Sequence, residues 1–178
     1  GGAVYPLTLQ KSLRAQQIAF ENRLPCISLV ESAGANLLYQ DEVFILGGRT
    51  FANQARLSAA GIPQVALVFG SSTAGGAYIP GMSDYVVMVR GRAAVYLGGP
   101  PLVKMATGEE SDDETLGGAE MHAHLSGLSD YLAEDDADAV RLARDVMERL
   151  RWGPAGPASF IDPDPALEPL YPPDQLAG

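Results

Sequence analysis

The chain has 178 residues, 47% of them hydrophobic, which is enough for one domain with a substantial core. Its net charge of −10 argues against nucleic acid or an anionic membrane surface as a partner. One cysteine and two histidines exclude an internal disulfide and a credible zinc site, and no apolar run approaches the roughly 20 residues that cross a bilayer.

The charge is unevenly distributed along the chain. Residues 1–108 carry eight Lys/Arg and five Asp/Glu, a net of +3, whereas residues 109–178 carry four and seventeen, a net of −13. We expect the first part to accept a small ligand that carries phosphate, and the second to form a solvated acidic surface or an assembly face.

The N-terminal third alternates helical and strand-like patterns. Cys26 falls in an apolar, strand-like run, and we expect it to be a core residue in a reducing compartment. The predicted elements are a helix over Leu9–Asn22 with Thr8 as its N-cap, a buried strand over Cys26–Val30, a small-residue loop over Glu31–Asn36, and a helix over Arg49–Ala60 that Gly47-Gly48 precede and Gly61 caps.

A glycine-rich turn follows the next apolar run. Gln64–Phe69 is β-branched and apolar, then Gly-Ser-Ser-Thr leads into Ala74-Gly75-Gly76-Ala77, which opens a predicted helix. Free backbone N–H groups at a helix start can hold developing negative charge. The same glycines would also serve a tight turn with close helix–strand packing, so the residues alone leave both interpretations open.

The rest of the chain continues this alternation, which predicts an α/β fold. From Gly153 on, Pro and Gly dominate, and we expect an extended tail or linker. The other predicted elements are strands over Tyr85–Val89 and Ala93–Leu97, a short helix over Leu102–Ala106 after Pro101, a helix near Thr115–His124 that Gly117-Gly118 weaken, a strand within Leu128–Leu132, and a helix over Glu134–Arg151.

Side chains offer little for catalysis. His122 and His124 are two residues apart on a predicted helix, so they point to roughly opposite faces and cannot pair as metal ligands. Ser71, Ser72 and Thr73 precede the glycines, but the G-x-S-x-G elbow of serine hydrolases is missing, so we do not expect nucleophilic catalysis.

The backbone at two strand ends is the remaining candidate. Ser32–Asn36 and Thr73–Ala77 each follow a predicted parallel strand, so both could turn N–H groups toward one crevice. Such an arrangement suits a reaction through an enolate or oxyanion, in which fixed N–H dipoles stabilise charge on one oxygen.

Four motifs occur in one order along the chain: Glu31–Asn36 (ESAGAN), Ser72–Tyr78 (STAGGAY), Leu97–Lys104 (LGGPPLVK), and Leu116–Ala119 (LGGA) with His122 and Ser126-Gly127. Together they resemble the carboxyltransferase (β) subunit of biotin-dependent acyl-CoA carboxylases, in the crotonase superfamily. The stretch ATGEE at 106–110 and the Gly-Gly-Pro-Pro form are similar to the methylcrotonoyl-CoA carboxylase branch.

The resemblance implies an α/β, crotonase-like (ClpP/crotonase) fold, here as a partial N-terminal lobe that binds acyl-CoA. Residues 1–152 would form this domain without its first segment. Residues 153–178 would form the Pro/Gly-rich tail or linker toward a C-terminal lobe that binds biotin. A fragment of this kind is expected to be inactive alone, because the family's active site lies where lobes of two subunits meet.

The implied activity is that of a ligase that forms C–C bonds. By the resemblance, carboxybiotin on a partner protein releases CO2, the biotin enolate takes a proton from the acyl-CoA, and the CoA enolate attacks CO2 through its α- or γ-carbon. The implied site consists of backbone N–H groups of Gly75 and Gly76 on the enolate oxygen, with Ala33, Gly34, Ala35, Asn36 and Tyr78 at the CoA and no metal. Propionyl-CoA carboxylases usually carry Arg at the position of Asn36.

Basic residues near the N-terminus are candidates for the CoA phosphates by charge and sequence proximity alone: Lys11, Arg14 and Arg23. The implied partners are acyl-CoA, a biotin carboxylase/biotin carrier (α) subunit and further copies in a homo-oligomer, with no nucleic acid or membrane. We expect a cytoplasmic protein if the source is bacterial and a mitochondrial matrix protein if it is eukaryotic.

Three other functions stay open. A biotin-dependent acyl-CoA decarboxylase or transcarboxylase subunit would share this lobe. A non-catalytic CoA-binding or assembly module would keep the fold without the chemistry, and a ClpP-like serine peptidase would use Ser72. The sequence does not name the acyl group among the acetyl, propionyl, methylcrotonoyl and geranoyl candidates.

Overall fold

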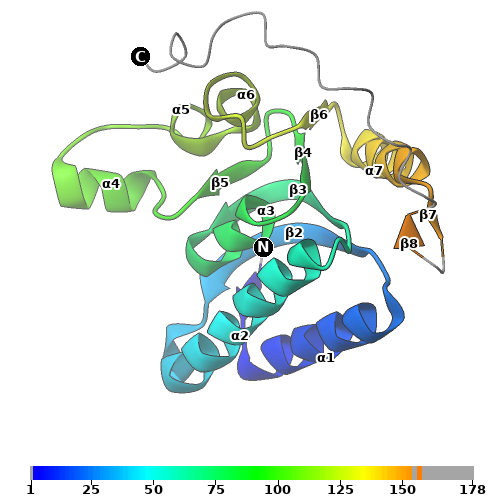
Figure 1. The fold of residues 1–178 in the computed structure, drawn as a ribbon. Helices are drawn as coiled ribbons and strands as arrows, with labels where there is room; N and C mark the ends of the chain where they lie inside the picture. The colour runs from blue at the N-terminus through cyan, green and yellow to red at the C-terminus, as the bar shows by residue number, and fades with distance from the viewer. Residues whose placement is uncertain (1, 154–155, 158–178) are drawn as a thin grey trace, which may run out of the picture.

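The computed structural model describes residues 2–153 and 156–157, and its main sheet is parallel throughout (Figure 1). The strand order is β1-β2-β3-β4-β6, and β5 pairs with the end of β3. Parallel strands connected by helices confirm the predicted α/β class. The strands are β1 (Gly2–Val4), β2 (Cys26–Ala35), β3 (Gln64–Thr73), β4 (Tyr85–Val89), β5 (Ala94–Tyr96) and β6 (Tyr131–Ala133), with a separate antiparallel pair, β7 (Trp152–Gly153) and β8 (Gly156–Pro157).

Both central strands are longer than their apolar runs. We predicted ends at Val30 and Phe69, but β2 continues to Ala35 and β3 to Thr73. Most of these small residues stay in the strands because β1 pairs with the end of β2 and β5 pairs with the end of β3. The predicted loop over 31–36 is therefore mostly strand, which places small side chains on a fixed backbone.

The first helix, α1 (Pro6–Asn22), begins earlier than predicted. Pro6 is its first residue, a position where a missing N–H breaks no helical hydrogen bond. Thr8 is consequently the third helical residue and not the N-cap, although its Oγ1 accepts a hydrogen bond from the N–H of Tyr5 at 3.3 Å.

The second helix, α2 (Gln40–Ala59), also begins earlier than predicted and follows a 3-10 turn, η1 (Leu37–Tyr39). It runs through Gly47 and Gly48, which we expected to precede it. Each internal glycine costs about 1 kcal/mol relative to alanine, which a helix of 20 residues can bear when it packs along α1. Gly61 follows the helix in the left-handed region, with φ at +68°.

Helices α1 and α2 lie side by side, and α7 (Asp136–Leu150) packs against β3, β4 and β6 (Figure 1). One apolar cluster joins Ala139 and Val146 of α7 to the strands, and another joins Ala19 of α1 to Leu57 of α2. All residues of β3 from Gln64 to Val68 are buried, as expected for a central strand.

The region after β5 is broken into short pieces. The helix predicted near 115–124 is three segments, because Gly118 is extended (φ −72°, ψ 169°) and separates the first two. A Cβ on Gly117 would lie 2.3 Å from the carbonyl oxygen of Val95, so only glycine allows β5 to approach. The pieces are α4 (Pro100–Thr107), α5 (Asp113–Gly117), α6 (Ala119–Met121), a π-turn η3 (His122–Ser126), and then β6 in place of the strand predicted within 128–132.

The tail predicted from Gly153 lies, apart from residues 153, 156 and 157, outside the described residues. The division of the chain at residue 152 therefore stays a prediction. Within the described ranges, no helix combines the length and the apolar character that a membrane crossing requires.

Candidate functional site

A large cleft lies between the paired helices and the two central strands, and it extends from their amino ends to their carboxyl ends. Its volume is about 1080 Å³, and its walls are mostly apolar. Helices α1 and α2 contribute Leu9, Ala15, Val43 and Phe51, while the end of β2 and the turn after β3 contribute alanines and glycines. A cleft of this size at the ends of parallel strands is the usual place for a small-molecule site in an α/β fold.

The two strand ends that we expected to share a crevice line this one cleft. Gly34, in β2, has φ at +84°, a conformation that other residues rarely adopt. A Cβ built there would lie 3.2 Å from both the Cβ of Ala74 and the carbonyl oxygen of Thr73. Gly34 therefore lets the end of β2 approach the turn after β3 closely.

The turn after β3 is a 3-10 helix, η2 (Ala74–Ala77), followed by a single helical turn, α3 (Tyr78–Gly81). Ala74 has φ at +51°, a strained value for a residue with a side chain. Because a 3-10 hydrogen bond spans three residues, the N–H groups of the first two, Ala74 and Gly75, have no partner within the helix. Gly75 is exposed in the cleft and Gly76 is buried behind it.

The other residues that we expected at the CoA separate into two groups. Ala33, Gly34, Ala35 and Tyr78 line the cleft, and the ring of Tyr78 stacks on Phe51 with centroids 4.8 Å apart and planes at 26°. Asn36 does not line it. Its Oδ1 accepts a hydrogen bond from the N–H of Leu38 at 3.0 Å and caps η1.

The basic residues proposed for phosphates do not line the cleft. Lys11 and Arg14 are exposed on α1. Arg23 lies 5.7 Å from the ring centroid of Trp152, and its Nη2 donates to the carbonyl oxygen of Ala60 at 3.5 Å. Arg23 thus holds the end of α1 to neighbouring elements.

The two histidines have separate environments, as their spacing predicted. His122 is buried, with Nδ1 2.7 Å from Ser126 Oγ and Nε2 2.8 Å from the carbonyl oxygen of Val95. His124 is exposed, and its Nε2 lies 3.0 Å from Glu120 Oε2. In the part of the chain that the structure describes, no group of three His, Cys, Asp or Glu side chains could hold a metal ion.

Cys26 lies at the edge of the cleft and is only half-buried, so its assignment to the core is corrected to a boundary position. Burial raises the pKa of its thiol, so a smaller fraction of Cys26 is the reactive thiolate than in a free cysteine.

Sequence reasoning missed several cleft residues on the helices. Gly47 and Gly48 line the cleft, and a Cβ on either would have no heavy atom within 4 Å. Gln16 donates from Nε2 to the carbonyl oxygen of Thr50 at 3.0 Å, while its Oε1 is buried without a partner. A glycine pair in the middle of a helix was the available signal, but we interpreted it as a helix boundary.

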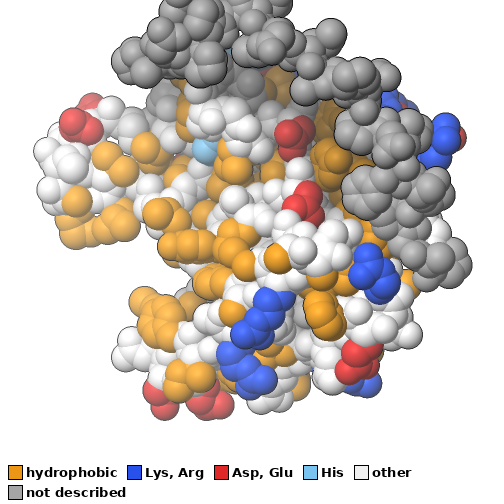
Figure 2. Space-filling model, viewed as in Figure 1, with side chains coloured by type: hydrophobic (Ala, Val, Ile, Leu, Met, Phe, Trp, Pro, Cys, Tyr) orange, Lys and Arg blue, Asp and Glu red, His pale blue; other side chains and the backbone are white. Residues whose placement is uncertain are grey.

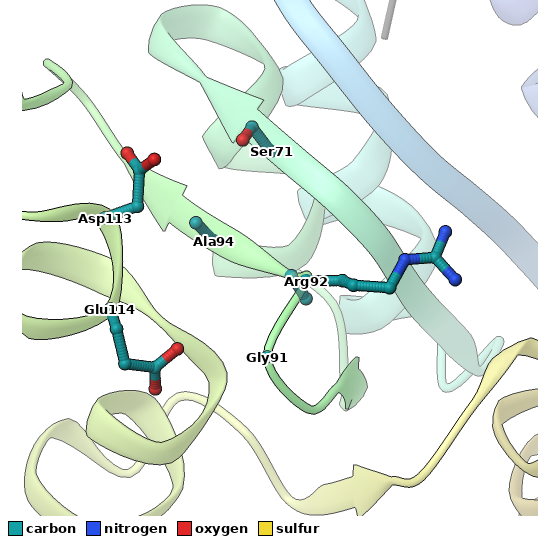
Figure 3. Close-up of a pocket in the computed structure, with 7 residues that line it drawn as sticks. Ser71, Gly91, Arg92, Ala94, Asp113 and Glu114 are labelled. Carbon is teal, nitrogen blue, oxygen red and sulfur yellow. The ribbon is translucent and has the colours of Figure 1, made fainter.

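A second, smaller pocket of about 160 Å³ lies where β5 approaches α5 and does not contain the predicted site (Figure 3). Its polar groups do not converge: Arg92 points away from Asp113 and Glu114 and pairs with Asp136 at 2.8 Å. We assign no chemistry to it.

Comparison with known proteins agrees with the geometry. Residues 1–176 match the carboxyl transferase domain family. The chain is 64% identical over 178 residues to a probable biotin-dependent acyl-coenzyme A carboxylase beta2 subunit of Mycobacterium tuberculosis, which covers 100% of this chain and 33% of that protein. It is 53% identical over 179 residues to the biotin-dependent 3-methylcrotonyl-coenzyme A carboxylase beta1 subunit of the same organism, with 99% and 33% covered.

The crystal structure of the geranyl-CoA carboxylase beta subunit of P. aeruginosa superposes with a TM-score of 0.80 at 56% identity, over 98% of this chain and 32% of that one. The likeness confirms the predicted crotonase-like fold and the resemblance to the methylcrotonoyl branch. The chain spans about a third of the length of the relatives it matches. It belongs to the carboxyl transferase domain family, whose members most similar in sequence here include β subunits of biotin-dependent acyl-CoA carboxylases.

Proposed function

We propose that the protein containing this chain transfers a carboxyl group from carboxybiotin to an acyl-CoA, and that residues 1–152 are its acyl-CoA-binding lobe. The observation that supports this most is the position of Gly75, whose N–H has no partner within η2 and which is exposed in an apolar cleft of about 1080 Å³. A cleft of that size suits an acyl chain and part of its CoA carrier.

The role of this lobe is to bind and polarise the substrate thioester. Its oxygen accepts a hydrogen bond from the N–H of Gly75 and gains charge as the substrate becomes an enolate; Gly76 shapes the same turn from its buried position. Removing one such donor typically costs about 3–4 kcal/mol of transition-state stabilisation. Carboxybiotin, held by the partner and by the second lobe, would supply the CO2.

The substrate class follows from the walls of the cleft. We propose a branched, unsaturated acyl-CoA of the methylcrotonoyl or geranoyl kind, because Gly47 and Gly48 leave the middle of α2 without side chains. Two of the relatives bear the names of such substrates. The residues Ala33, Gly34, Ala35 and Tyr78 would contact the CoA arm, whereas Asn36 would act only as a helix cap.

Partners follow from the exposed apolar surface. Apolar side chains gather on the surface over α4 and near the start of α2 (Figure 2). Leu102 and Met105 of α4, and Leu38 and Ile45 near the start of α2, are exposed, with Leu38 at 88%. Apolar patches of this kind usually mark protein contacts. We propose that a second copy and the α subunit that carries biotin cover them.

The burial of Ser72 argues against one of the competing functions. Ser72 is fully buried, so it cannot act as the nucleophile of a ClpP-like peptidase. A decarboxylase or transcarboxylase subunit would use the same turn with another partner.

The test is carboxylation by the full-length protein with a biotin carboxylase and a biotin carrier, over acetyl-, propionyl-, methylcrotonoyl- and geranoyl-CoA. We expect turnover that is fastest with the branched substrates, and none from residues 1–178 alone. Carboxylation by residues 1–178 alone would contradict the assignment of a half-site, and turnover of none of the four substrates would contradict the proposed function.

A further inference from the structure

Two buried serines lie directly behind Gly76. Ser32 of β2 and Ser72 of β3 are paired in the parallel register, and their side chains are 8% and 0% exposed. A Cβ built on Gly76 would lie 3.0 Å from Ser32 Cβ, 3.1 Å from Ser32 Oγ and 3.1 Å from Ser72 Oγ. The two hydroxyl groups therefore form the wall against which this part of the turn rests.

The hydroxyl of Ser32 also fixes the other strand end. Its Oγ accepts a hydrogen bond from the buried N–H of Gly34 at 3.1 Å. Gly34 in turn approaches Ala74 and the carbonyl oxygen of Thr73 closely. Ser32 thus accepts a hydrogen bond from Gly34 on one side of the turn that carries Gly75, and it lies beside Gly76 on the other.

The hydroxyl of Ser72 has a different character. It is fully buried, and no hydrogen-bond partner lies within reach of its Oγ in the described structure. A buried polar atom without a partner is rare and lowers stability compared with an apolar group of the same shape. A contribution to stability therefore does not explain why residue 72 carries a hydroxyl group. The position of that hydroxyl beside Gly76 offers a reason.

We propose that Ser32 and Ser72 are positioning residues that set the direction of the N–H of Gly75 in the cleft. The inference rests on the proposed function, in which that N–H holds the thioester oxygen. Ser32 acts through its hydrogen bond to Gly34, and both serines act by filling the space beside Gly76, where a Cβ would lie only 3.0–3.1 Å from them. Neither serine touches the substrate.

The test uses the full-length protein with its biotin-bearing partner and the acyl-CoA that it carboxylates fastest. We expect Ser32→Ala and Ser72→Ala to lower kcat by about tenfold to hundredfold, because misplacing a reacting group by a fraction of an ångström to 1 Å has effects of this order. KM should change by less than about threefold, because the contacts with the CoA arm remain. The control is Ser71→Ala, the same change on the neighbouring residue of β3, which is exposed and points to the opposite face.

Two further measurements separate positioning from loss of structure. Ser72→Ala should leave the unfolding temperature unchanged or raise it, because the variant removes a hydroxyl without a partner. Amide hydrogen exchange over residues 73–78 should be faster in both variants than in the parent and in Ser71→Ala. This readout does not depend on carboxylation, so it tests the positioning even if the parent protein carboxylates nothing.

Three results would overturn the proposal. One is a kcat within twofold of the parent in both variants, and another is unchanged exchange over residues 73–78. The third is a loss of activity in Ser32→Ala, Ser72→Ala and Ser71→Ala alike, in proportion to a fall in the unfolding temperature of each variant. An inactive parent with faster exchange in Ser32→Ala and Ser72→Ala would instead refute the proposed function while supporting the positioning.

Discussion

Replacing Gly76 by alanine should destabilise the protein, whereas replacing the adjacent Gly75 should not. The two glycines lie side by side in η2, and neither has a positive φ, so the backbone itself accepts alanine at both positions. The difference lies in the surroundings. The added methyl group would lie 3.0–3.1 Å from atoms of Ser32 and Ser72 in Gly76→Ala. In Gly75→Ala it would have no heavy atom within 4 Å.

The size of the effect follows from these contacts. Distances of 3.0–3.1 Å are tighter than nine in ten contacts of real Cβ atoms, and here they come from two paired strands that cannot move apart independently. Overpacking of this kind costs about 1–3 kcal/mol. Alanine at Gly75 should instead stabilise by about 0.4–1 kcal/mol, because it reduces the conformational freedom of the unfolded chain.

The assay is thermal unfolding of the full-length variants, followed by circular dichroism. A change of 1 kcal/mol corresponds to about 2–4 °C for a domain of 150–250 residues. Gly76→Ala should therefore unfold several degrees below the parent, and Gly75→Ala at or slightly above it. Equal shifts in the two variants would refute the reasoning that Gly76 is needed for its contacts with the serines.

Three further outcomes follow from the structure. Gly47→Ala and Gly48→Ala should each stabilise α2 by up to about 1 kcal/mol, yet lower activity with geranoyl-CoA more than with methylcrotonoyl-CoA in steady-state kinetics. Equal losses with the two substrates would contradict a role of Gly47 and Gly48 in acyl selection. His122→Ala should lower the free energy of unfolding by about 1–3 kcal/mol, measured in urea, because Ser126 and the carbonyl group of Val95 lose their hydrogen-bond partner. His124 is exposed, so His124→Ala should change this free energy by no more than about 0.5 kcal/mol. Cys26 should react with iodoacetamide more slowly than a free thiol at pH 8, and the rate should rise only at higher pH because burial raises its pKa; reaction at the free-thiol rate would place it in open solvent.

Elements with a strong apolar pattern were predictable from the sequence. The strand over Tyr85–Val89 was predicted with the bounds that the structure has, and the helix predicted over 134–151 is α7, with Asp135 as its N-cap. In both cases burial on defined faces fixes the pattern of side chains, so a local window contains the necessary information.

The ends of β2 and β3 were not predictable in this way. Ser32 and Ser72 lie in small-residue stretches that are typical of loops, and they stay extended only because strands distant in sequence pair with them. The predicted start of α2 was wrong for a related reason. Gly47-Gly48 weakens a helix locally, but packing along α1 outweighs that preference.

The candidate site was predictable only in part. The resemblance carried by the ordered motifs pointed to both Gly75 and Gly76, and small-residue strand ends suggested a shared crevice. Neither could show that Gly75 is exposed while Gly76 is buried. The contacts of Ser32 and Ser72 with Gly76 depend on the register of two strands. The spacing of residues within a single segment of the sequence does not determine how two strands are aligned.

The most direct test of the central claim is a crystal structure of the full-length protein with methylcrotonoyl-CoA bound. We expect the acyl group in the cleft between α1, α2 and the strand ends, with the thioester oxygen about 2.7–3.2 Å from the backbone nitrogen of Gly75. A thioester bound elsewhere, or one whose oxygen faces away from Gly75, would contradict the account.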